Sequence, residues 1–152
     1  MNEIVEKYRF KYLKATNSLL LISIFMIVRT IFFLFNNESM LYLLEINRLL
    51  DHLGVVVSQS SKAIGIIIDL SMTIVVSLMI AYIWKEAQRG KIKIFIGFVI
   101  FYFLDMFLYF YSYDVVSFFI HFVFLAYMVF GLIFYKKMYV EYLVSKNKEK
   151  EE

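Results

Sequence analysis

Four apolar runs, each close to the length that crosses a bilayer as a helix, dominate this chain of 152 residues. A bilayer core about 30 Å thick takes about 20 apolar residues in an α-helix. The runs cover about 17–36, 63–84, 94–111 and 115–135. Hydrophobic residues make up 62% of the chain, well above the roughly 45–50% of soluble domains, and the mean hydropathy is +0.73. The sequence therefore predicts an all-α integral membrane four-helix bundle.

The segments outside the runs hold most of the charge. We expect a basic arm over 1–16, a single membrane domain over 17–140 and a charged tail over 141–152, of which Ser145–Glu152 is solvated and disordered. A basic stretch ahead of an apolar run is also typical of a signal peptide. This run, however, is long, contains Arg29 and lacks a small-residue cleavage site. We therefore expect it to be retained as the first span.

Lysine and arginine alternate between the connections and predict the orientation. Four lie in 1–16, two in 37–62, four in 85–93, none in 112–114 and five after the fourth run. Because cytoplasmic segments keep the positive charges, both termini and 85–93 are predicted to be cytoplasmic. The protein is then a multi-pass protein of the cytoplasmic (inner) membrane. The aromatic residues that fall at its interfaces are Trp84, Tyr111, Tyr113 and Tyr135.

The outer connection between the first two runs has helical periodicity over about 38–53. Its leucines fall on one side, and its polar residues, including Glu45, Arg48 and Asp51, fall on the other. This pattern predicts an extra interfacial helix. The polar side is a candidate docking face for an outside partner, or the helix lies in the headgroup layer only because its leucines prefer that position.

Each run contains one ionisable residue, and these residues are the candidate functional site. They are Arg29, Asp69, Asp105 and His121. Each lies about six or seven residues from the outer end of its run, which corresponds to a depth of about 9–11 Å at 1.5 Å per residue. Because ionisable groups at membrane depth are costly and face a partner or a cavity, the common depth predicts one shared polar layer.

Other polar side chains extend this layer at helical spacing. The supporting residues are Thr73, Ser77, Tyr102, Tyr109 and Ser117. Within the layer we expect Arg29 to pair with one of the two aspartates and His121 to bond the other. The four ionisable groups carry a net charge of −1 when His121 is neutral and zero when it is protonated.

Four roles remain open for the polar layer. It holds the helices together, forms a proton or ion pathway, binds a metal ion, or performs intramembrane catalysis. The chain has no cysteine and no HExxH, GxSxG or Walker A motif, which disfavours the last two roles. We expect no cofactor, no metal, no catalytic residue and no nucleic-acid partner, since the net charge of +3 reflects the flanks of the membrane spans.

The second half of the chain is similar to small, uncharacterised four-span bacterial membrane proteins with an Asp in span three and a His and a Gly in span four. The residues that carry the resemblance are Phe103-Leu104-Asp105, Asp114, Ser117, His121, Gly131-Leu132 and Lys136-Lys137. Ile120 stands before His121, where those proteins have Phe. The resemblance covers about the last 60 residues and implies a bacterial source and a four-span fold, without an activity.

These features favour a non-enzymatic structural or interaction protein, such as a subunit of a membrane complex. Its expected partners are the lipid bilayer and either a second copy or another membrane protein. The first alternative is a small proton- or cation-translocating protein in which Asp69, Asp105 and His121 form the relay. A further alternative rests on architecture alone, because the chain also resembles membrane-embedded bacteriocin immunity proteins.

Overall fold

The structure, a computed structural model, describes residues 3–34, 56, 62–109 and 114–151. The described residues form four helices, which are α1 (Glu3–Leu34), α3 (Lys62–Gln88), α4 (Ile92–Met106) and α6 (Val115–Glu151). No strand occurs in this part of the chain, so the all-helical class is confirmed. The interfacial helix predicted over 38–53, with its docking face at Glu45, Arg48 and Asp51, lies outside the described residues and stays a prediction.

Three of the helices are long and apolar enough to cross a membrane. These candidate spans are Glu3–Phe32, Ala63–Gln88 and Val115–Lys148. Helix α4 has 15 residues, which gives a length of about 22 Å against a bilayer core of about 30 Å. Tight turn bonds follow it, from the amide of Phe107 to the carbonyl of Leu104 and from Leu108 to Asp105. The third predicted span is therefore shorter than its apolar run of 94–111.

The outer two helices continue beyond their predicted spans. Helix α1 includes most of the predicted basic arm, and α6 runs on to Glu151. The expectation of a disordered tail is thus wrong for the described residues. Residues 132–151 contain neither glycine nor proline, and lysine and glutamate are good helix formers, so the helix continues through the charged tail.

A tight turn joins α3 to α4 where the sequence predicts a connection over 85–93. The amide of Gly90 donates to the carbonyl of Ala87 at 2.9 Å, and the amide of Lys91 donates to that of Glu86 at 3.1 Å. Gly90 has a φ of 84°, so these bonds form the glycine-closed end of a helix known as a Schellman motif. The Glu86 carboxylate is buried and pairs with both Arg89 and Lys91.

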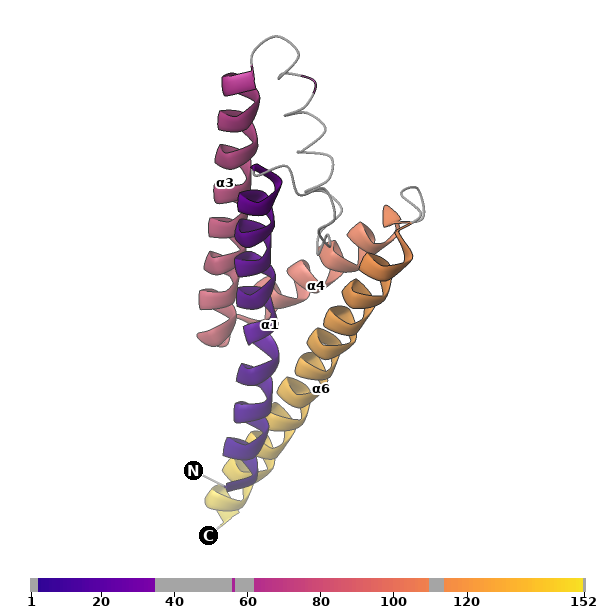
Figure 1. Cartoon of the computed structure of the whole chain (residues 1–152). Coiled ribbons are helices and arrows are strands. Elements are labelled where there is room, and N and C mark those ends of the chain that lie inside the picture. The colour runs from indigo at the N-terminus through magenta and orange to yellow at the C-terminus, as the bar shows by residue number, and fades with distance from the viewer. Residues whose placement is uncertain (1–2, 35–55, 57–61, 110–113, 152) are drawn as a thin grey trace.

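Helix α1 is the centre of the packing. It contacts both α3 and α6 extensively, whereas α4 meets α3 and α6 over smaller areas. Half of the apolar stretch of α1 is buried, against 28% for those of α3 and α6. Figure 1 shows α1 beside α3 and crossing the lower part of α6, with the start of α1 and the end of α6 at the same end of the molecule. The two other long helices are thus both packed against α1.

Helices α1 and α6 come close together at a glycine. A Cβ atom added to Gly131 would lie 2.7 Å from the Cβ of Ala15 and 3.5 Å from the Phe95 ring. Real Cβ atoms essentially never come within 3.0 Å of another heavy atom. Small residues at helix crossings are typical of membrane proteins, because they let two backbones come close and gain van der Waals contact. Gly131 therefore sets the distance between α1 and α6.

We expect Gly131→Ala to lower the free energy of unfolding by about 1–3 kcal/mol, the usual cost of overpacking a core. The Cβ of Ala15 has no rotamer through which to move aside, so the helices must separate. Thermal unfolding in detergent measures the effect. Gly97→Ala is the matched control, because nothing lies within 4 Å of its added methyl, and it should leave stability unchanged or raise it. A Gly131→Ala protein as stable as the Gly97→Ala protein would contradict this packing.

Candidate functional site

The structure brings two of the four ionisable residues together, Asp105 of α4 and His121 of α6. Both are buried, with at most 4% of either residue exposed. The Nδ1 atom of His121 lies 3.9 Å from the Oδ2 atom of Asp105, and its Nε2 atom lies 2.7 Å from the carbonyl oxygen of Tyr102. A carbonyl oxygen only accepts, so Nε2 carries a proton and donates. A second proton would bind at Nδ1, on the side of the ring that faces the carboxylate.

Two tyrosines of the predicted layer enclose the His121 ring. The Tyr102 ring stacks on it with a centroid distance of 3.6 Å and an interplanar angle of 8°. The Tyr109 ring meets it edge-on at 5.2 Å. The Tyr102 hydroxyl is buried and has no hydrogen-bond partner among the described residues. The imidazole is therefore held between aromatic rings, with its polar atoms directed at α4.

The other two ionisable residues, Arg29 of α1 and Asp69 of α3, are buried in a different helix pair. The hydroxyls of Thr30 and Thr73 lie 3.0 Å apart and join α1 to α3 beside them. Thr30 follows Arg29 directly, and Thr73 lies one helical turn after Asp69. The single layer that connects all four ionisable groups stays a prediction, as does the pairing of Arg29.

Hydroxyl groups line the contact between α1 and α3, which we call the α1–α3 seam. Besides the bond between Thr30 and Thr73, the Ser23 hydroxyl donates to the carbonyl oxygen of Ser77 at 3.1 Å. The predicted supporting residues Thr73 and Ser77 thus both contact α1. The partner residues on α1 were missed, although Thr16, Ser23 and Thr30 recur every seven residues and so share one helix face.

A second polar cluster lies at the end of the α1–α3 seam where α3 ends. The hydroxyl of Tyr12 donates to the carbonyl oxygen of Ala87 at 2.9 Å. The side-chain amide of Gln88 donates to the Thr16 hydroxyl at 2.7 Å, and the indole N–H of Trp84 donates to Asn17 at 3.1 Å. Sequence reasoning did not select Tyr12 or Gln88, because a tyrosine in a basic arm and a glutamine at a helix end carry no distinctive pattern.

Ser117, the last of the predicted supporting residues, takes part in the start of α6. Its amide donates to Oδ1 of Asp114 at 3.0 Å, and its hydroxyl donates to Oδ2 of the same residue at 2.7 Å. A carboxylate that accepts from the third amide of a helix is an N-cap. Ser117 therefore contributes to the beginning of the helix that carries His121.

The described residues contain no group of three or more His, Cys, Asp and Glu side chains that could hold a metal ion. Asp105 and His121 offer two donors, whereas structural and catalytic zinc sites take three or four from the protein. The chemistry that this arrangement supports is proton binding and hydrogen bonding between helices.

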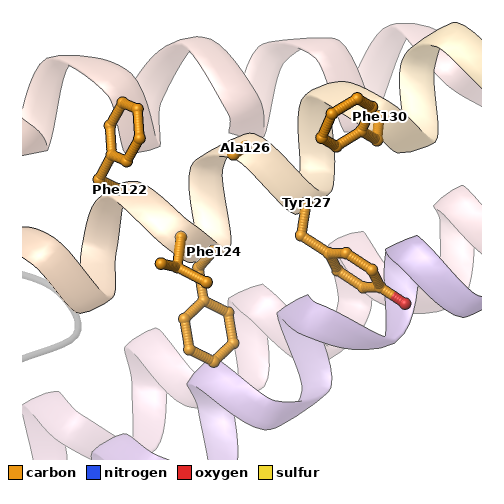
Figure 2. Close-up of a pocket in the computed structure, with 6 residues that line it drawn as sticks. Phe122, Phe124, Ala126, Tyr127 and Phe130 are labelled. Atoms are coloured by element: carbon orange, nitrogen blue, oxygen red, sulfur yellow. The ribbon is translucent and has the colours of Figure 1, made fainter.

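An open apolar groove of about 420 Å³ lies along α6. Figure 2 shows Phe122 and Phe130 on one side of the helix and Phe124 and Tyr127 on the other. Every residue that lines the groove belongs to this one helix, and Phe122 and Phe130 are exposed. The groove is thus part of the apolar outer surface, which is the kind of surface that lipid chains cover in a membrane.

Comparison with protein-family models, with curated proteins and with solved structures finds no match for this chain.

The α1–α3 seam leads to a prediction for Thr73→Val, which keeps the volume of the side chain and removes the hydrogen bond to Thr30. We expect the free energy of unfolding in detergent to fall by about 0.6–2 kcal/mol, the range for hydrogen bonds between membrane helices. Ser71→Ala is the control on the same helix, because its exposed hydroxyl donates only to the Ile67 carbonyl of α3. If both variants lose the same free energy of unfolding, the hydrogen bond between Thr30 and Thr73 does not contribute to stability.

Proposed function

We propose that this chain is a non-enzymatic, multi-pass membrane protein with a structural or interaction role, such as a subunit of a membrane complex. In this role its buried polar side chains fix the register of the helices. Its surroundings are the bilayer of the cytoplasmic membrane and a second copy or another membrane protein. Both termini are then cytoplasmic, in agreement with the distribution of Lys and Arg.

The observation that supports this proposal is that polar residues of the predicted layer form hydrogen bonds to neighbouring helices. Thr73 and Ser77 bond to α1, and His121 bonds to α4. In hydrocarbon a polar group without a partner costs several kcal/mol, so such bonds favour one arrangement of the helices over its alternatives. Three long helices with largely apolar outer faces are compatible with a membrane protein that relies on such bonds.

A second candidate function is the translocation of protons or small cations. It is favoured by the fixed orientation of His121, whose Nδ1 atom faces Asp105 and is the position at which a proton would be taken up. Protonatable residues at membrane depth are typical of proton relays. Asp69 would extend the relay, and Arg29 would adjust its charge.

The two functions make different predictions for Asp105→Asn and His121→Ala. Under the structural function, both variants lower stability in detergent by about 1–3 kcal/mol, because each leaves a buried polar group without its partner. Liposomes with the wild-type protein should then show no proton or cation flux above that of empty liposomes. Flux and thermal unfolding are measured on the same preparations.

The control is Glu141→Gln, which removes a charge from α6 far from His121 in the sequence and should change neither quantity. The structural function is wrong if the wild-type protein conducts and Asp105→Asn abolishes the flux while the unfolding temperature is unchanged. That result would establish the relay in its place.

A further inference from the structure

A small cleft lies where α1, the end of α3 and α6 meet, beside the α3–α4 turn. Its volume is about 140 Å³. The residues that matter for its chemistry are Arg9, Tyr12 and Leu13 of α1, Arg89 of the turn, and Tyr135 and Met138 of α6. Three elements that are distant in the sequence thus form one cleft. It shares Tyr12 and Gln88 with the second polar cluster, but neither Asp105 nor His121 lines it.

Two arginines from different elements line this cleft. Arg89 pairs with Glu86 at 2.7 Å, and Lys91 pairs with the second oxygen of the same carboxylate. One negative charge is therefore shared by two positive ones. Among the described residues no acidic side chain pairs with Arg9. The cleft thus has an excess of positive charge, and arginine presents a planar fork of N–H donors that matches phosphate oxygens.

The remainder of the cleft is apolar and aromatic. The rings of Tyr12 and Tyr135 lie 5.1 Å apart, and Leu13 and Met138 complete the lining. The hydroxyl of Tyr12 already donates to Ala87, so this residue presents its ring. A ligand that matches both parts has an anionic group for the arginines and an apolar body for the lining, as a phospholipid has.

The position of the cleft favours a lipid. Trp84 and Tyr135 are predicted at the cytoplasmic interface of the membrane, and the cleft lies at Tyr135 and one turn beyond Trp84. Thirteen of the sixteen Lys and Arg residues fall in 7–14, 85–93 and 136–150, the three segments at this end. Basic pockets between membrane helices on the cytoplasmic side are where anionic headgroups bind.

We propose that this cleft binds the phosphate of an anionic phospholipid of the inner leaflet, with Arg9 and Arg89 as the phosphate ligands and the tyrosine rings against the glycerol and upper acyl region. This inference goes beyond the proposed function. It requires only that the cytoplasmic ends of α1, α3 and α6 lie at the membrane surface.

The chain supplies its own reporter for a binding test, because Trp84 is its only tryptophan. Purified protein in neutral detergent is titrated with phosphatidylglycerol brominated in the upper acyl chain, or with brominated phosphatidylcholine, and the quenching of Trp84 fluorescence is followed. Wild-type protein should be quenched at lower concentrations by phosphatidylglycerol. Arg9→Gln combined with Arg89→Gln should weaken that binding by about tenfold or more, since each cation near an anionic lipid surface contributes substantially.

Lys146→Gln combined with Lys148→Gln is the matched control. It removes two positive charges, as the double arginine variant does, but from a part of α6 about 16 Å beyond the cleft residues of that helix. This distance exceeds the screening length at physiological salt. The affinity of this lysine variant for phosphatidylglycerol should stay within about twofold of that of the wild type. Arg9→Gln alone changes an exposed side chain without an acidic partner, so it tests the cleft even if the Arg89 variant unfolds.

Three results would overturn the proposal. The first is that phosphatidylglycerol and phosphatidylcholine quench Trp84 of the wild-type protein equally. The second is that the arginine and lysine variants lose affinity for phosphatidylglycerol equally. The third is that inorganic phosphate at the same concentration displaces the brominated lipid completely. The last result would assign the cleft to a free phosphate in place of a lipid.

Discussion

Inside a bilayer no water is present to bond a polar side chain, so such a side chain needs a partner on a neighbouring helix. In the membrane setting that we propose, this constraint accounts for the contacts of the buried polar residues in this protein. Thr30 faces Thr73 across the α1–α3 seam, and His121 bonds the backbone of α4. A helix that rotated or slid by one residue would lose these bonds while keeping an apolar outer face. The polar groups therefore select one register among many packings that hydrophobicity alone leaves nearly equal.

Helix α1 connects these contacts into one structure. Its hydroxyl groups bond α3, and on a neighbouring face Ala15 meets Gly131 of α6 at close range. In the N-terminal half of α1, Tyr12 reaches both neighbours, because its hydroxyl donates to the Ala87 carbonyl and its ring packs against Tyr135. The helix between the two long partners is thus the most buried of the three candidate spans. The cleft lined by Arg9 and Arg89 lies where these same three helices meet.

The sequence predicted the four helices and the burial of Arg29, Asp69, Asp105 and His121, because hydropathy and the cost of ionisable groups act residue by residue. It left open which aspartate His121 would meet and did not predict the partners on α1, since these depend on the rotation of each helix about its own axis, and apolar faces all round leave that rotation undetermined. The length of the Asp105 helix was overestimated, because apolar composition does not mark the turn after Met106. The prediction of a disordered tail was wrong, because it gave more weight to charge than to the helix propensity of lysine and glutamate.

If polar contacts between helices hold this protein in one arrangement, Asp105 and His121 are energetically coupled across the contact between α4 and α6. A double-mutant cycle measures this coupling. The free energy of unfolding is measured in bicelles for the wild type, Asp105→Asn, His121→Gln and the double variant. Glutamine at position 121 keeps a donor for the Tyr102 carbonyl and removes the group that can become charged. We predict a coupling energy of about 0.6–2 kcal/mol between the two residues. Effects that add to within about 0.3 kcal/mol would contradict it.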